Sequence, residues 1–230
     1  MKVTKNRKAS EAKFDGTKLY SVKDVMSMVK DITTTKFDAS VDMSVRLGVD
    51  PRKANQMVRG SVTLPHGTGK TVKVLVMCTP DKEEEAKAAG ADYVGLDEYV
   101  QKIKDGWTDV DVIITVPAAM GKVGQLGRIL GPRGLMPTPK AGTVTDNVAE
   151  AITAVKAGRV EFKMDKTGSL AVVVGKRSFT SVQLQENTST ALEAVSSSRP
   201  DGFKGKFIKN VYISSTMSPS VKLDTSTLNL

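Results

Sequence analysis

At 230 residues and 40% hydrophobic content, the chain is long enough for one large domain or two small ones around a real core. No apolar run is long enough for a membrane span, and the basic start lacks the apolar segment of a secretory signal. Cys78 is the only cysteine, which excludes an intrachain disulfide and indicates a reducing compartment. The net charge of +9 indicates a polyanionic partner, with a merely soluble basic protein as an equal alternative.

The first part of the chain predicts a mixture of helix and strand. Ser21–Ile32 places its apolar residues on one helical face, and Val41–Leu47 alternates apolar and polar residues as a half-buried strand does. Asp50 followed by proline is typical of a helix start. We therefore expect a helix from Asp50 to Gly60 and then a strand over Ser61–Leu64.

The middle of the chain alternates strands with helices. The expected strands are Thr71–Cys78, Asp92–Gly95 and Val110–Val116, and the expected helices are Asp81–Ala89, Leu96–Lys104 and Asp146–Ala157. Thr145 or Asp146 is expected to cap the last of these helices, and Gly158 to end it. This alternation predicts a small parallel sheet, Rossmann-like in outline.

The last part of the chain returns to the strand pattern. Val160–Met164 and Leu170–Val174 are separated by a turn at 165–168, which predicts a hairpin. A helix over Gln183–Ser197 and a last strand over Asn210–Ser215 follow. Together these elements are typical of an antiparallel α+β domain.

Neither flank of the chain has enough strands for a stable sheet of its own. We therefore predict an α/β protein with a discontinuous α+β first domain, residues 1–66 and 159–230, and an inserted Rossmann-like second domain, residues 67–158. The chain would cross between domains at His66-Gly67 and at Gly158-Arg159. Glycine at both crossings predicts a hinge.

The charge is unevenly divided between these two domains. Residues 67–158 carry 11 Lys and Arg against 12 Asp and Glu, whereas 1–66 carry 13 against 7 and 159–230 carry 10 against 6. The whole positive excess belongs to the discontinuous domain, which favours nucleic-acid binding by that domain.

Two glycine-rich segments raise the alternative of a phosphate-handling enzyme. Pro65–Thr71 resembles a phosphate-binding loop, but Leu64 stands where the first glycine would be, and a strand rather than a helix should follow. Met120–Val144 lacks a dinucleotide fingerprint and carries four cations, Lys122, Arg128, Arg133 and Lys140. It either meets a phosphate backbone or the other domain, or is a tightly turned connection. No catalytic set accompanies either segment, so we expect no catalysis, no metal and no cofactor.

The candidates for RNA contact flank two strands of the basic domain. They are Lys36, Phe37, Ser40, Lys204, Lys206, Thr216, Met217 and Ser218. The residues around Phe37 are polar and show no periodic spacing of apolar residues that would place it in a core. Phe37 either stacks on a base or is a core aromatic. Thr216-Met217 either offers hydroxyl and backbone groups to RNA or is an ordinary strand end.

Long motifs in this chain resemble the family of the bacterial large-subunit ribosomal protein L-one. They are KFDASVDMSVRLGVDPRKANQMVRGSVTLPHGTGK at 36–70, GADYVG at 90–95, GRILGPRGLMPTPKAGTV at 127–144 and FKGKFIKNVYISSTMSPSV at 203–221. The resemblance covers nearly the whole chain, with the motifs in the family's order. It implies a split first domain with an inserted Rossmann-like second domain.

The resemblance also implies function and partners. The family binds 23S rRNA in the large ribosomal subunit, forms the mobile stalk that contacts exit-site tRNA, and can repress its own operon mRNA. It implies a cytoplasmic, ribosome-bound protein that is a monomer when free. A translational repressor without a ribosomal role is a further alternative.

The family's RNA contacts map onto Lys36, Phe37, Thr216 and Met217. This chain has Ser218 where the family usually has glycine, which puts a backbone contact there in doubt. The family's hairpin contacts are not carried over, because this chain has Ser-Leu-Ala at 169–171 where the family often has His or Asn.

Overall fold

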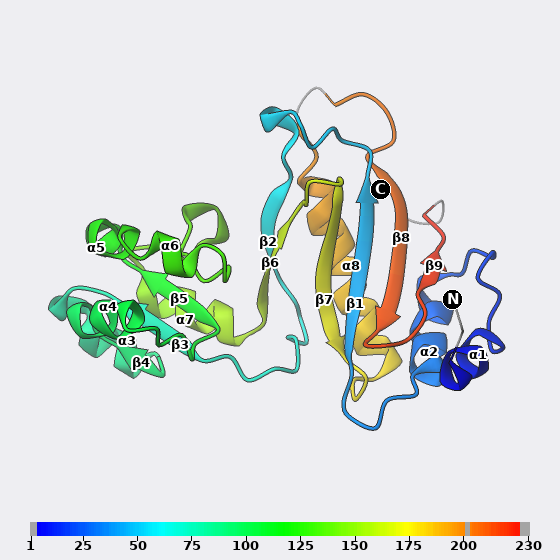
Figure 1. The fold of residues 1–230 in the computed structure, drawn as a ribbon, viewed down its shortest axis with the longest axis horizontal. Helices are drawn as coiled ribbons and strands as arrows, with labels where there is room; N and C mark the ends of the chain where they lie inside the picture. Colours follow the sequence, from blue (N-terminus) through cyan, green and yellow to red (C-terminus); the bar gives the residue numbers. More distant parts are fainter. Residues whose placement is uncertain (1–3, 201–202, 226–230) are drawn as a thin grey trace. The chain divides into compact units, whose positions relative to one another are not determined.

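The chain folds as two compact units, which we describe separately. The computed structural model describes residues 4–200 and 203–225, and it separates Met1–Gly69 with Val160–Leu230 (unit 1) from Lys70–Arg159 (unit 2) (Figure 1). Unit 1 carries 22 Lys and Arg against 13 Asp and Glu, and unit 2 carries 12 against 12. The whole positive excess therefore lies in the unit built from both ends of the chain.

Unit 1 is an antiparallel sheet covered on one face by helices. Its elements are α1 (Lys5–Glu11), α2 (Val22–Ile32), β1 (Ser40–Leu47), the 3₁₀ turn η1 (Ala54–Gln56), β2 (Arg59–Thr63), β6 (Arg159–Lys163), β7 (Ser169–Lys176), α8 (Ser181–Ser197), β8 (Ile208–Ser215) and β9 (Val221–Leu223). The main sheet has the order β7-β1-β8-β9, and β2 pairs with β6 in a second, two-stranded sheet. β1 is thus a central strand whose two neighbours both come from the later part of the chain (Figure 1).

Local sequence explains the helices that cover this sheet. The Ser21 hydroxyl accepts the N–H of Asp24 at the start of α2, and the apolar stripe of α2 is fully buried. α8 begins with a capping box, in which the Thr180 hydroxyl accepts the N–H of Gln183 and the Gln183 side chain accepts the N–H of Thr180. Both helices pack on the face of the sheet to which Val41, Met43, Val45 and Leu47 contribute.

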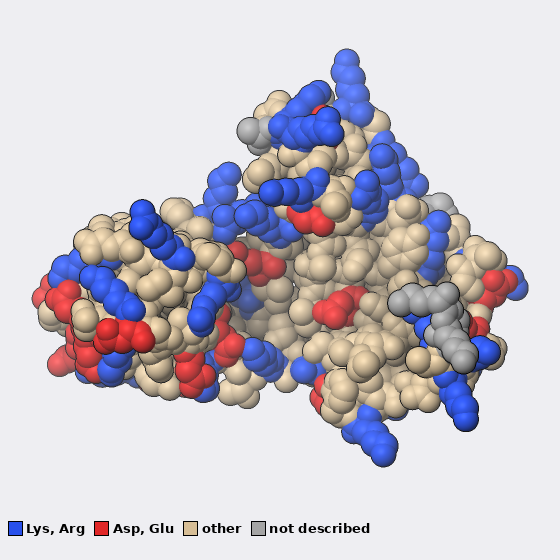
Figure 2. Space-filling view, in the orientation of Figure 1, with Lys and Arg blue, Asp and Glu red and all other residues tan. Residues whose placement is uncertain are grey.

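The opposite face of the main sheet is open and mostly uncharged. Its residues are Asp42, Ser44, Arg46, Ser169, Ala171, Val173, Asn210, Tyr212, Ser214 and Lys222. α8 lies behind the sheet in Figure 1, so the open face is the one seen in Figure 2. The side chains of Ser44, Ser169, Ala171 and Ser214 are small, so another molecule can approach the backbone closely beside them.

Three predictions for unit 1 are wrong. The helix expected from Asp50 to Gly60 is only the short turn η1, because Asp50 engages in local bonds: its carboxylate accepts the N–H of Arg52 at 3.0 Å, and its own N–H donates to Gln56. Gly60 lies in β2, where a Cβ would stand 2.7 Å from the Phe162 ring, so close packing requires the glycine.

The expected hairpin over 160–174 is also wrong in its pairing. The turn forms, with the Asp165 carboxylate accepting the N–H groups of Thr167 and Ser169 and with Gly168 at φ 80°. The two strands then diverge, β6 to β2 and β7 to β1. In addition, β8 is not the last strand, because β9 follows it, and α1 was not predicted.

Unit 2 is the predicted parallel α/β layer. Its sheet has the order β4-β3-β5 and is formed by β3 (Val74–Met77), β4 (Tyr93–Val94) and β5 (Val112–Thr115). Its helical elements are η2 (Pro80–Lys82), α3 (Glu83–Ala88), α4 (Asp97–Lys104), η3 (Pro117–Ala119), α5 (Met120–Gly124), α6 (Gly127–Leu130), η4 (Pro139–Ala141) and α7 (Val148–Lys156). α3 and α7 pack on one face of the sheet, and α4, α5 and α6 on the other.

Two details of unit 2 differ from expectation. The cap of α7 is Asn147, whose side chain accepts the N–H of Glu150, rather than Thr145 or Asp146. Met120–Val144 is not one open loop, since Val123 of α5, Leu130 of α6 and Leu126 between these helices are buried in the core. As predicted, a strand and not a helix follows Pro65–Thr71, so the phosphate-loop geometry is absent from this segment.

Within the described ranges, no helix is long and apolar enough to cross a membrane. The same residues contain no group of three or more His, Cys, Asp and Glu side chains placed to hold a metal ion.

Candidate nucleic-acid interface

Two of the predicted contact segments meet at one end of the main sheet of unit 1. β1 begins at Ser40 and β8 ends at Ser215, and the two strands are antiparallel neighbours. The Ser40 carbonyl accepts both the N–H of Thr216 at 3.0 Å and its hydroxyl at 3.3 Å. We call this end, comprising residues 35–40, 176–179 and 215–218, the Phe37 end. It brings together six of the eight predicted RNA-contact residues: Lys36, Phe37, Ser40, Thr216, Met217 and Ser218.

A chain of hydroxyl groups fixes the turn that follows β8. The buried Ser215 hydroxyl lies 2.5 Å from that of Thr33 and donates to the Ser218 hydroxyl at 2.8 Å. The N–H of Ser218 donates to the Ser215 carbonyl at 3.0 Å, which closes the turn. Thr216 and Met217 are therefore held at the top of a hydrogen-bonded turn rather than on a loose strand end.

Met217 is the exposed tip of this turn. Its side chain is 86% exposed, and its φ of 64° is the only positive value at a non-glycine residue in the described part of the chain. Ser218 therefore does not need the backbone freedom of glycine, because the left-handed conformation falls on Met217 instead. An exposed apolar side chain on a fixed turn of unusual backbone geometry is typical of a binding site.

Phe37 is also exposed on a fixed backbone. Its ring is 54% exposed, so the alternative of a core aromatic is wrong. The Asp38 carboxylate accepts the N–H and the hydroxyl of Ser178, each at 2.9 Å. Arg177 donates its side chain to the carbonyl of Thr35 and its N–H to that of Ala39. The backbone around Phe37 is therefore held while the ring faces solvent.

The residues that hold Phe37 were not found from the sequence. They lie in the turn between β7 and α8, and Lys176 at the end of β7 adds a bond from its ammonium to the Ser40 hydroxyl at 3.1 Å. Only the register that places Ser40 opposite Lys176 brings this turn to the site, and that register is a tertiary feature. No sequence pattern near residue 177 indicated it.

Lys204 and Lys206 lie at the other end of the same sheet. Leu47 at the end of β1 is opposite Ile208, and Gly48 donates its N–H to the Phe207 carbonyl at 2.7 Å. An eight-residue strand is about 25 Å long, so these lysines cannot join the Phe37 end. Both side chains are exposed.

The end that contains Lys204 and Lys206 gathers many further cations, and we call it the Arg46 end. Figure 2 shows Lys and Arg side chains clustered where β1 ends and β8 begins. By their positions on the elements there, the cluster comprises Arg46, Arg52, Lys53, Arg59, Lys163, Lys166, Lys204, Lys206 and Lys209. Arg59 is paired with Glu161 at 3.3 Å.

The open face carries one carboxylate, that of Asp42, between the Phe37 end and the Arg46 end. Burial raises the pKa of Asp42, and the nearby Lys176 ammonium opposes that change. Asp42 is the one acidic residue of the open face, so most of this surface is neutral or positive.

The four predicted cations of unit 2 have different surroundings. Lys122 pairs with Asp97 at 2.6 Å, and Arg133 donates to the hydroxyl of Thr108. Arg128 on α6 and Lys140 on η4 are exposed.

The first crossing between the units is held by a buried asparagine. Asn187 on α8 accepts the N–H of His66 at 3.1 Å and donates to the carbonyls of Gly67 at 3.0 Å and Val174 at 2.8 Å. The His66 ring also contacts the Glu186 carboxylate. His66 and Gly67 are therefore attached to unit 1.

The residues on the unit 2 side of the crossings are attached to unit 2. Lys70 pairs with Asp111, whose pKa is lowered by that bond and by the N–H of Lys73. At the second crossing, Arg159 packs so closely on Gly142 that a Cβ there would lie 2.7 Å from its guanidinium carbon. Gly158 itself ends α7 at φ 103°.

Comparison with known proteins gives consistent results over nearly the whole chain. Residues 29–219 match the Ribosomal protein L1p/L10e family. The chain is 60% identical to the large ribosomal subunit protein uL1 of Parabacteroides distasonis and to that of Bacteroides fragilis, over 97% of this chain and 96% of each relative. The uL1 protein of Flavobacterium johnsoniae is likewise 60% identical, over 97% of both chains.

The split unit with its antiparallel sheet, the inserted parallel unit and these matches agree with one another. The chain belongs to the Ribosomal protein L1p/L10e family.

Proposed function

We propose that this protein is a constituent of the large ribosomal subunit that binds 23S rRNA directly through unit 1. Together with that RNA it forms the mobile stalk that contacts exit-site tRNA during translation, and it represses its own operon by binding a similar site in the mRNA. This role is structural and regulatory rather than enzymatic. The observation that carries the proposal is the Phe37 end, where exposed Phe37 and Met217 project from hydrogen-bonded segments of the basic unit.

The chemistry of the Phe37 end suits folded RNA. The Phe37 ring can stack on an unpaired base or a ribose, and Met217 can fill an apolar gap beside it. The Ser40 and Thr216 hydroxyls can meet 2′-hydroxyl or phosphate oxygens, while Lys36 supplies a cation. Because the backbone is held before RNA arrives, little conformational entropy is lost on binding.

The open sheet face extends the interface away from the Phe37 end. Ser44, Ala171 and Ser214 leave the backbone accessible, so an RNA backbone can lie against the sheet. At the far end of the sheet, Lys204, Lys206 and the other cations of the Arg46 end add attraction for phosphate without sequence preference. Arg128 and Lys140 of unit 2 are the candidates for contact with exit-site tRNA.

The units move about a hinge, but its flexible links do not include all four of the predicted residues His66, Gly67, Gly158 and Arg159. Asn187 holds the first pair to unit 1, and Gly142 packs against Arg159 in unit 2. The rotation therefore falls on the link Gly69–Lys70 and on the boundary at Arg159, the residue that both ends unit 2 and begins β6. Spin labels on the two units should give a broad distance distribution in the free protein, and a single sharp distance would contradict the hinge.

Ribosome association tests the proposal directly. The full chain should co-sediment with large subunits and protect one compact region of 23S rRNA from cleavage at near-physiological salt. The double variant Phe37→Ala, Met217→Ala should lose that protection, whereas Met57→Ala, at a similarly exposed apolar residue, should keep it. Protection of scattered sites by all three chains would show charge attraction alone. Tight binding of ATP or GTP in the presence of Mg²⁺ would instead favour the phosphate-handling alternative.

A further inference from the structure

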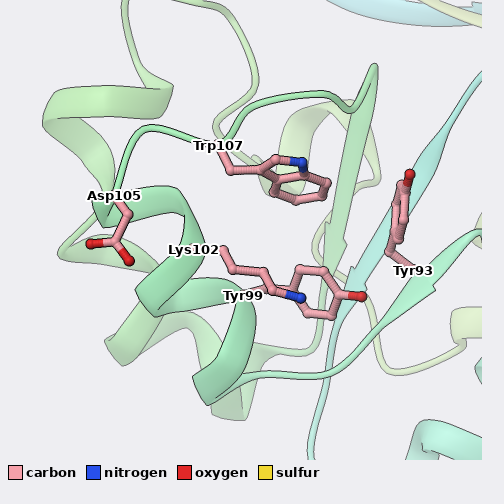
Figure 3. Close-up of a pocket in the computed structure, with 5 residues that line it drawn as sticks. All are labelled: Tyr93, Tyr99, Lys102, Asp105 and Trp107. Atoms are coloured by element: carbon pink, nitrogen blue, oxygen red, sulfur yellow. The ribbon is translucent and has the colours of Figure 1, made fainter.

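Unit 2 carries an aromatic pocket that the RNA interface of unit 1 does not use. Tyr93 lies on β4, the strand next to β3. Tyr99 lies on α4, and Trp107 lies in the loop that leads to β5 (Figure 3). The Trp107 ring stands 5.2 Å from Tyr93 at 89° and 5.6 Å from Tyr99 at 44°. With Lys102 and Asp105 these rings line an open pocket of about 360 Å³.

The rings do more than cover the core beneath them. All three remain partly exposed, although they pack on the apolar cluster between the sheet and α4. Within the described residues, no hydrogen bond engages the Tyr93 and Tyr99 hydroxyls, the Trp107 indole N–H or the Asp105 carboxylate. The pocket therefore offers flat apolar faces together with unused donors and an unused acceptor at its rim.

Size and charge indicate which kind of guest fits. The volume lies at the small end of the range for small-molecule sites, which suits a single flat ring system rather than a peptide segment. The Lys102 ammonium already lies 4.8 Å from the centre of the Tyr99 ring, and it is paired with Glu98. A second cation would be repelled from that position, whereas the phosphate of a nucleotide would be attracted to it.

We propose that this pocket binds one unpaired nucleobase of an RNA, with guanine preferred. The base takes the place of the Lys102 ammonium on the face of the Tyr99 ring and lies against Trp107, and the displaced ammonium faces its phosphate. The Asp105 carboxylate can only accept hydrogen bonds, and guanine presents two adjacent N–H donors on its Watson–Crick edge. Uracil presents a single N–H between two carbonyl oxygens. The negative carboxylate would repel these two oxygens.

The chain has a built-in reporter for this site, because Trp107 is its only tryptophan. Full-length protein is titrated with 5′-GMP and with 5′-UMP at constant ionic strength. Trp107 fluorescence and the single indole N–H resonance are followed together. We expect saturable quenching and a shifted indole resonance with GMP, and roughly tenfold weaker binding of UMP.

Two variants and a matched control test the geometry. Asp105→Asn should remove the preference for GMP and leave the affinity for UMP near that of the wild type. Tyr99→Leu keeps apolar volume over the core and should weaken both nucleotides roughly tenfold. Asp109→Asn, the same change in the same loop but at a carboxylate paired with Lys73 outside the pocket, should bind as the wild type does.

The outcomes separate this site from the RNA interface of unit 1. Phe37→Ala should bind GMP normally, so failure of one proposal leaves the other intact. A non-saturable response with an unmoved indole resonance would overturn the proposal, because the rings would then only cover the core. Tetramethylammonium that shifts the indole resonance while GMP does not would also overturn it, in favour of a cation-binding cage. A GMP preference that survives Asp105→Asn would refute the recognition by Asp105.

Discussion

The carbonyl oxygen of Ser40 accepts two hydrogen bonds from Thr216, one from its N–H at 3.0 Å and one from its hydroxyl at 3.3 Å. Residues 176 positions apart in the chain are thereby joined at one point of the sheet. Ser40 is also held by Lys176, so three segments of unit 1 meet around a single serine. The groups on these segments that we propose to contact RNA keep fixed relative positions.

Thr216→Val tests the role of the hydroxyl at this junction. The backbone bond to Ser40 remains, so the free energy of unfolding should fall by less than about 1 kcal/mol. Affinity for the rRNA fragment should fall by about 1–3 kcal/mol if the hydroxyl serves a buried partner in the complex. Thermal unfolding and filter binding on the same preparation give the two numbers. Unchanged affinity would remove Thr216 from the interface.

Phe37→Ala separates stacking from folding. Because the ring is 54% exposed, the melting temperature of the free protein should stay within about 2 °C of the wild type. Loss of a stacked base should lower RNA affinity by roughly 1–3 kcal/mol. Met57→Ala is the matched control, since Met57 has the same exposed fraction but lies outside the Phe37 end. Equal affinity losses for both variants would argue against specific stacking.

Unit 1 alone should keep most of the RNA affinity. Its apolar core is formed entirely by residues before Gly69 and after Arg159, so a chain joining these parts through a short Gly-Ser linker should fold. Circular dichroism establishes folding before binding is measured. With about five phosphate contacts, the log–log slope of affinity against salt should be near −4. A slope near zero would show that the charge of unit 1 is not used.

Asn187→Leu should weaken unit 1 at the crossing. The change leaves the N–H of His66 and the carbonyls of Gly67 and Val174 without their buried partner. The free energy of unfolding should drop by roughly 2–4 kcal/mol, as denaturant titration measures. Asn210→Leu makes the same change on the open face and should cost much less. Equal losses would indicate that side-chain size, rather than the lost bonds, sets the cost.

Asp42 should give unit 1 a small dependence on acid pH. Burial raises its pKa in the folded chain, so its contribution favours folding below the ordinary aspartate pKa and is lost as pH rises through the folded value. Asp42→Asn should therefore raise the melting temperature at pH 7, and the difference should disappear below about pH 4. RNA affinity at pH 7 should also rise, because a negative charge leaves the open face. A melting-temperature difference that persists at low pH would contradict the assignment.

Much of the fold could be predicted because local signals and tertiary packing agree. The apolar stripe of Ser21–Ile32, the alternation of Val41–Leu47 and the strand–helix order of the middle segment all correspond to elements in the structure. The signal at Asp50-Pro51 failed because an Asx turn and a helix cap begin with the same residues. The predicted pairing of β6 with β7 was wrong because the residues at 165–168 determine the turn but not which strands pair on either side of it.

The candidate site could be predicted in part. The polar neighbours of Phe37 left its exposure open, and the resemblance indicated Phe37, Thr216 and Met217 as contacts. The support from Arg177 and Ser178 could not be found, because nothing in their own segment shows which loop they face. Likewise, the distance of Lys204 and Lys206 from Phe37 depends on strand direction, which is fixed only by the sheet. No periodic pattern in the sequence predicts the aromatic pocket, since β4, α4 and a loop each supply one ring.

The position of β1 in the middle of its sheet has a consequence for synthesis on the ribosome. Both strands that flank β1, Ser169–Lys176 and Ile208–Ser215, emerge after the whole of Lys70–Arg159 has been made. Until then, Ser40–Leu47 has neither neighbour, and the Thr216 partner of Ser40 does not yet exist. A nascent chain that has not yet reached Ser215 therefore lacks the Phe37 end. Under the proposed function, such a chain should not compete with finished copies for rRNA or for the mRNA.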